Sequence, residues 1–154
     1  MSTATRWRHV LSIASILLII AACGTAPDTG GNDVSWSEIA SGSSTRARSE
    51  GVTVARSRSE AERLKEELGI RSEQFTPSEI DFDTEAVVAV RLGERPTGGY
   101  RIAVDGASRV DGEIVISASE VAPDPGDMVT QAITYPYTVL RVTASPDEEV
   151  RVDK

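Results

Sequence analysis

The sequence predicts a mainly β domain, a small antiparallel sandwich or open barrel with one helix near its N-terminal end. Short runs rich in β-branched residues recur along the chain, and glycine and proline turn signals separate them. Only one segment has clear helical periodicity. A chain of 154 residues is long enough for one such domain together with processing segments.

Six segments have the β-branched, alternating or apolar composition of strands, and they are residues 34–39, 51–56, 86–92, 100–104, 113–119 and 128–142. The first could instead be an arm packed on the domain. Residues 86–92 are apolar at nearly every position, which predicts a central strand buried on both faces. Pro136 interrupts any ladder in the last segment, which we expect to be one strand or a bent pair.

The helix is expected between residues 57 and 69. Ser57 or Ser59 can act as the N-cap, because a glutamate follows each of them at the spacing of a capping box. Gly69 fits the C-terminal stop. The apolar positions recur at helical spacing, at Ala61, Leu64 and Leu68.

The chain begins like an exported protein. Arg6, Arg8 and His9 precede an apolar run over residues 10–22, which at roughly 13 residues is too short for an ordinary transmembrane helix and typical of a signal peptide. The run ends in Ile-Ala-Ala before Cys23, which resembles a bacterial lipobox. The resemblance implies that residues 1–22 are removed and that Cys23 carries a lipid. Cys23 has no second cysteine for an intrachain disulfide.

These features predict a domain tethered to a membrane of the bacterial cell envelope, facing outside the cytoplasm. After the signal peptide at 1–22, residues 23–33 have the composition of a flexible spacer. The folded, monomeric domain is expected over residues 34–146. Residues 147–154 form a charged tail that we expect to be frayed.

Composition argues against an enzyme. His9 is the single histidine and leaves with the signal peptide, and the single cysteine is the proposed anchor. A Ser-His-Asp or Cys-His arrangement, and the usual zinc and copper ligands, are therefore missing from the mature chain. We predict no catalytic residue, no metal and no cofactor. The formal net charge of −8 also argues against nucleic acid as a partner.

Carboxylates leave two alternatives open. A glycosidase-like pair is compatible with composition, although nothing marks two carboxylates as facing one cleft. Calcium could use Asp81 and Asp83, or Asp124 and Asp127, but neither pair has the spacing of a calcium loop. Both pairs are explained more simply as turn and cap residues.

The most constrained loop is predicted over residues 93–100. Pro96 fixes its own φ, and positive φ at Gly98 and Gly99 would suit a compact turn between antiparallel strands. Tyrosine and arginine are frequent interface anchors. The candidate partner-binding residues are Arg95, Pro96, Thr97, Gly98, Gly99, Tyr100, Tyr135 and Tyr137.

The ordered motifs at residues 93–100, 123–126, 129–131 and 134–137 resemble the C-terminal domain of the PrcB family, named for a subunit of a bacterial surface protease complex. The likeness extends over residues 34–142. It implies an accessory, non-catalytic, exported domain that binds a protease or helps to mature it.

A more distant likeness is to chagasin-type inhibitors of cysteine proteases, whose Asn-Pro-Thr-Thr-Gly-Tyr loop enters the protease cleft. Arg95 stands here in place of that asparagine and Gly98 in place of the second threonine. The tryptophan-bearing loop of those inhibitors has no clear counterpart in this sequence.

Two functional classes follow. One is a protein-binding module, either protease-associated or inhibitor-like, and the other is a structural envelope lipoprotein without a protease partner. An exposed patch formed by Arg95, Thr97 and Tyr100 would favour the first class, whereas burial of these residues would favour the second.

Overall fold

The computed structural model describes residues 32–71 and 73–154. The predicted signal peptide, the lipidation site at Cys23 and most of the predicted spacer lie outside these residues. None of the helices formed by the described residues has both the length and the apolarity needed to span a bilayer.

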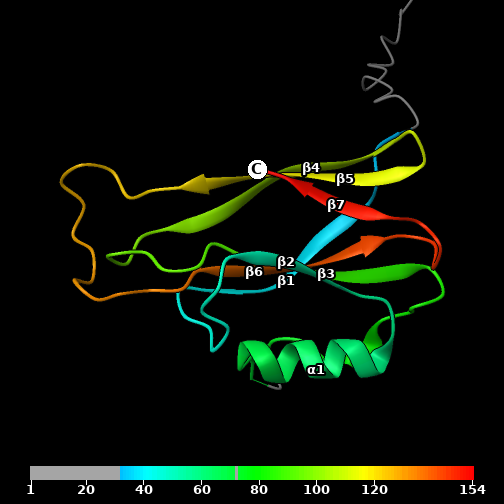
Figure 1. Cartoon of the computed structure of the whole chain (residues 1–154), viewed down its shortest axis with the longest axis horizontal. Helices are drawn as coiled ribbons and strands as arrows, with labels where there is room; N and C mark the ends of the chain where they lie inside the picture. The colour runs from blue at the N-terminus through cyan, green and yellow to red at the C-terminus, as the bar shows by residue number, and fades with distance from the viewer. Residues whose placement is uncertain (1–31, 72) are drawn as a thin grey trace, which may run out of the picture.

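Two sheets face each other in a small sandwich (Figure 1). The first has the strand order β1-β6-β3-β2 and the second the order β4-β5-β7. Neighbouring strands are antiparallel except for β5 and β7, which are parallel. The sheets do not close into a barrel, so the predicted fold class is confirmed as a sandwich. The strands are β1 (Trp36–Gly42), β2 (Gly51–Ala55), β3 (Glu85–Arg91), β4 (Arg101–Val110), β5 (Glu113–Val121), β6 (Tyr137–Thr143) and β7 (Val150–Asp153).

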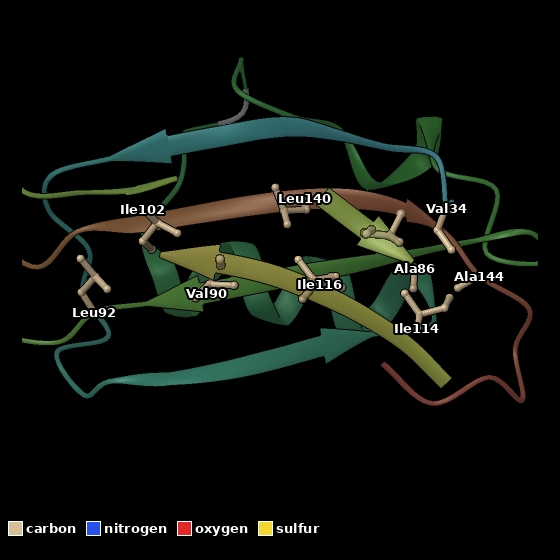
Figure 2. Packing of buried hydrophobic residues seen from close by; sticks show 13 residues of the cluster. Val34, Ala86, Val90, Leu92, Ile102, Ile114, Ile116, Leu140 and Ala144 are labelled. Carbon is tan, nitrogen blue, oxygen red and sulfur yellow. The ribbon is translucent and has the colours of Figure 1, made fainter. Parts of the chain in front are cut away.

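Strand β3 is apolar throughout because it separates two hydrophobic clusters. Val88 and Val90 belong to the core between the sheets, whereas Val87 and Ala89 belong to the core beneath the helix. All four are at most 1% exposed. Figure 2 shows the cluster between the sheets, with Leu92 and Ile102 near one end. The expectation of a central strand buried on both faces is confirmed.

The helix α1 (Arg58–Leu68) covers the outer face of the first sheet (Figure 1). The Ser57 hydroxyl accepts a hydrogen bond from the Glu60 amide, and Gly69 ends the helix at φ 72°. The apolar face consists of the three predicted residues, Ala61, Leu64 and Leu68. A short 3₁₀ turn, η1 (Pro77–Glu79), follows.

The connection over residues 93–100 is not a hairpin turn. Strand β3 pairs with β2 and β6, while β4 pairs with β5, so residues 93–100 carry the chain from one sheet to the other. Local sequence does not distinguish the two cases, because both need constrained backbone between apolar strands. The tight turn is instead between β4 and β5, where Asp111 and Gly112 have φ of 52° and 86°.

The predicted strand over residues 128–142 is wrong in its first half. Strand β6 begins at Tyr137, and the preceding residues form an irregular loop. Pro136 has no amide hydrogen, so it cannot extend the ladder. The β-branched and apolar residues from Met128 to Ile133 therefore have the composition of a strand without pairing as one.

The tail is not frayed. Strand β7 lies within residues 147–154 and pairs in parallel with β5, with Val150 opposite Ile114. Val150 and Val152 pack against the core between the sheets. The ordered domain therefore continues beyond Pro146. At its start, Asn32 accepts a backbone hydrogen bond from Arg109 of β4.

Candidate functional site

Two loops join at one end of the sandwich, at the left of Figure 1. We call residues 93–100 and 122–135 together the loop end. Arg95 and Thr134 exchange backbone hydrogen bonds at 2.9 Å each, and the Gly98 amide donates to the Thr130 carbonyl at 2.8 Å. The Thr134 hydroxyl donates to the Thr97 carbonyl at 2.7 Å. These bonds fix the two loops against each other.

Arg95 holds the loop end to the second sheet. Its Nε and one terminal nitrogen donate to the two carboxylate oxygens of Glu120 on β5, at 2.7 and 2.5 Å. Its other terminal nitrogen donates to the carbonyls of Leu92 and Glu94, both at 2.8 Å. The side chain is only 20% exposed. The guanidinium is therefore occupied within the domain.

The two hydrogen bonds between Arg95 and Glu120 shift the pKa values of both side chains. The hydrogen bonds from Arg95 lower the pKa of Glu120 below its ordinary value of 4.5. Conversely, the hydrogen bonds to Glu120 raise the pKa of Arg95. Since Arg95 follows β3 and Glu120 lies in β5, the pair bridges the two sheets.

Gly99 allows the two loops to approach closely. Its φ is 86°, and a Cβ atom there would lie 2.8 Å from both Pro123 Cβ and Val129 Cγ1. The expectation of positive φ is thus confirmed at Gly99 and wrong at Gly98, whose φ is not positive. Gly93, which the sequence analysis did not single out, has a φ of 74° where the chain leaves the first sheet.

The three tyrosines have different environments. Tyr100 is half-buried, with the Arg95 guanidinium 6.0 Å from its ring centroid. The Tyr135 hydroxyl donates to Glu94 at 3.1 Å, and Arg48 lies over the same ring. Tyr137 is 6% exposed and belongs to the core beneath the helix. Among the candidate residues, Tyr137 is therefore set apart from the surface of the loop end.

The remaining candidate residues of the loop end differ in their exposure to solvent. Pro96 and Gly99 are exposed, Thr97 is half-buried and Gly98 is buried. Arg95, Thr97 and Tyr100, which could have formed an exposed patch, are all half-buried. They support the conformation of the loop end, and their contact with a partner stays a prediction.

Two exposed apolar residues of the loop end are not among the candidates predicted from sequence. Met128 is fully exposed and Ile133 is 59% exposed, the two highest values among the large hydrophobic residues that the structure describes. Val129, between them, instead packs against Gly99. Both residues are visible in the sequence as apolar positions, but the segment that contains them was assigned to a strand.

The aspartates considered for calcium have local roles. The Asp81 carboxylate accepts from the Asp83 amide and the Thr84 hydroxyl, and the Asp127 carboxylate accepts from the Asp124 amide. These are turn contacts. Within residues 32–71 and 73–154, no three histidine, cysteine, aspartate or glutamate side chains gather in a metal-binding arrangement.

Residues 86–143, which run from β3 to β6 and include the whole loop end, match the family model described as PrcB C-terminal. This segment is similar to the PrcB C-terminal family. The PrcB resemblance is thereby confirmed for residues 86–143, and the loop end lies wholly within the matched segment. The chagasin likeness has no such support and stays a prediction. No curated protein and no solved structure matches the chain.

The surface of the loop end exposes side chains that a partner could contact. It presents the apolar side chains of Met128 and Ile133 on one loop and the exposed Pro96 on the other, and backbone hydrogen bonds join the two loops. Such a surface suits recognition of another protein, because apolar anchors on ordered backbone bind with little loss of conformational freedom.

Proposed function

We propose that this chain is a lipid-anchored lipoprotein of the bacterial cell envelope whose PrcB C-terminal domain binds a protein partner through the loop end. The partner is an exported protease or a component of its complex, and the chain acts as a non-catalytic accessory subunit. The observation that carries the proposal is the pair of exposed apolar residues, Met128 and Ile133, on a loop of the matched segment that is fixed by backbone bonds.

The loop end combines exposed apolar side chains with an ordered backbone. Single exposed apolar residues are common on protein surfaces and carry no information. Met128 and Ile133, however, lie on one loop, and both would gain about 1.5–3 kcal/mol by complete burial against a partner. The hydrogen bonds of Arg95 and Gly98 to this loop reduce the entropy lost when a partner binds.

The alternative, a structural envelope lipoprotein without a protease partner, is favoured by the internal contacts of Arg95. A guanidinium already bound to Glu120 has few free donors for a partner. In our proposal Arg95 shapes the surface, and Met128 and Ile133 form the contact. The inhibitor-like reading would instead need residues 95–100 themselves to enter a protease cleft.

The test is affinity capture with the full chain from membrane extract. Met128→Ser combined with Ile133→Ser should reduce retention of the protease component at least tenfold, since hot-spot truncations cost about 2 kcal/mol or more. Val110→Ser is the matched control, because Val110 is 44% exposed in the β4–β5 hairpin, away from the loop end. Equal retention by both variants, or the absence of any protease component, would favour the structural alternative.

A further inference from the structure

Met128 carries the only sulfur atom among the residues that the structure describes. The other methionine, Met1, belongs to the predicted signal peptide, and the single cysteine, Cys23, is the proposed site of lipid attachment. The Met128 side chain is fully exposed. Because oxidation of methionine is a chemical modification that requires access to the sulfur, this thioether is a candidate modification site.

The backbone on both sides of Met128 is held in place. Before it, the Asp127 amide donates to the Asp124 carbonyl at 3.0 Å, and the Asp127 carboxylate accepts from the Asp124 amide, also at 3.0 Å. These two bonds close a tight turn. After it, Val129 packs against Gly99 on the other loop. Since both neighbours are fixed, the exposure of the Met128 side chain follows from the fold of the loop end.

The chemistry of a solvent-exposed thioether is selective. Hydrogen peroxide transfers one oxygen atom to the sulfur: the S–O bond forms, the O–O bond breaks, and one proton moves to the departing oxygen, which leaves as water. The sulfur loses two electrons and the peroxide gains them. Trp36, the only tryptophan of the described residues, packs against the core between the sheets. Peroxide should therefore react first at Met128.

The sulfoxide changes the character of the loop end. A thioether is apolar and adapts its shape to a contact surface. Methionine sulfoxide is polar and chiral, and burial of its oxygen without a hydrogen-bond donor is unfavourable. Ile133, the other exposed apolar residue of this loop, has no group that peroxide oxidises. Oxidation thus removes one of the two apolar contacts and leaves the other.

We propose that Met128 is a reversible oxidation site that controls the contact between the loop end and its protein partner. The thioether form binds the partner, and the sulfoxide form binds it more weakly. Methionine sulfoxide reductases return the side chain to the thioether form. This inference rests on the proposed function, since the loop end must contact a partner for oxidation to weaken the contact.

The first measurement needs no partner. The full chain in detergent is treated with hydrogen peroxide, with and without urea, and the peptide that contains Met128 is quantified by mass spectrometry. Because the fold leaves the sulfur uncovered, the oxidation rates in the folded and unfolded chain should agree within about twofold. A rate at least about tenfold slower in the folded chain would show that the sulfur is covered, and it would overturn the proposal.

The second measurement is affinity capture from membrane extract. The full chain is treated with hydrogen peroxide until Met128 is completely oxidised, and catalase removes the peroxide before untreated extract is added. The oxidised chain should retain the protease component at least about fivefold less than the untreated chain. The two reductases that act on the sulfoxide epimers should restore retention. The melting temperature should not change, because the modified side chain lies outside the core.

Two variants show whether Met128 is the residue responsible. Met128→Leu has no sulfur, so peroxide should leave its retention of the protease component unchanged, whatever the starting level. Met128→Gln is polar from the start, and without peroxide it should retain as little as the oxidised chain. An equal loss in Met128→Leu after peroxide, or retention by Met128→Gln at the level of the untreated chain, would overturn the proposal.

The inference and the proposed function fail in different ways. Equal retention of the protease component before and after complete oxidation of Met128 would overturn only the control by oxidation. An untreated chain that retains no protease component would overturn the proposed function, and the control by oxidation with it.

Discussion

Gly99 is the single residue whose replacement tests the contact between the two loops. Its positive φ disfavours any side chain by about 1–2 kcal/mol. The close approach to Pro123 and Val129 should add at least about 1 kcal/mol. Gly126 is the matched control, because it also has positive φ but nothing within 4 Å of an added Cβ. Urea unfolding should show Gly99→Ala to be less stable than Gly126→Ala, and equal stabilities would contradict the described contact.

Replacement of Arg95 tests whether this side chain stabilises the fold. From sequence, a residue reserved for a partner should be replaceable by alanine within about 0.5 kcal/mol of stability. The contacts with Glu120, Leu92 and Glu94 change this expectation. Arg95→Ala should lower the free energy of unfolding by about 1–2 kcal/mol, after allowance for partial exposure. Arg95→Lys should restore only part of it, since lysine cannot form the two-point contact.

The effect of Arg95→Ala should depend on pH. The pKa of Glu120 is lower in the folded protein than its ordinary value of 4.5. The ion pair therefore contributes fully above about pH 4.5, and the contribution is lost as pH falls through the lowered pKa. Unfolding curves at several pH values should show the unmodified chain and Arg95→Ala converging at acid pH. A difference that is constant with pH would mean that the carboxylate is not involved.

At the scale of elements, β7 is the strand that the sequence analysis did not predict. Ending the chain after Pro146 should cost about 2–4 kcal/mol, because it removes the packing of Val150 and Val152 and uncovers the edge of β5. Removal of Lys154 alone is the control, since it deletes one exposed ion pair. Urea unfolding of the two truncated chains makes the comparison. A chain ending at Pro146 that is as stable as the full chain would show β7 to be dispensable.

The elements differ in how far local sequence determines them. The helix could be predicted with its ends because Ser57 and Gly69 act within the chain segment itself. The apolar run of β3 was sufficient to predict that this strand is buried on both faces. The partner of β7 is 36 residues away in sequence, at Ile114 opposite Val150, and four alternating residues carry too weak a pattern to distinguish a strand from a charged tail.

The candidate site was predictable in its composition but not in its geometry. Glycine and proline marked residues 93–100 as a constrained loop, whereas most of the second loop was assigned to a strand. That Arg95 would be bound to Glu120 depends on the stacking of the two sheets, which no local pattern encodes. For the same reason, sequence alone could not show whether Met128 is exposed on a loop or paired in a strand.

At the scale of the whole molecule, the anchor is a prediction about residues outside the described part of the chain. Cys23→Ser should abolish incorporation of a fatty-acid analogue and leave uncleaved precursor or released protein, because the lipobox chemistry requires the thiol. Metabolic labelling in the host cell is the measurement. Label retained by the Cys23→Ser variant would exclude Cys23 as the lipidation site.

The central claim is that the loop end contacts a component of an exported protease complex. The most direct measurement places a photo-crosslinking amino acid at position 128 of the full chain in living cells, with position 110 as the control, and identifies the adducts by mass spectrometry. Position 128 is fully exposed at the loop end, and position 110 is exposed in the β4–β5 hairpin. We predict a light-dependent adduct with a protease or its subunit at position 128 and none at position 110. The absence of such an adduct at position 128, or equal adducts at both positions, would contradict the account.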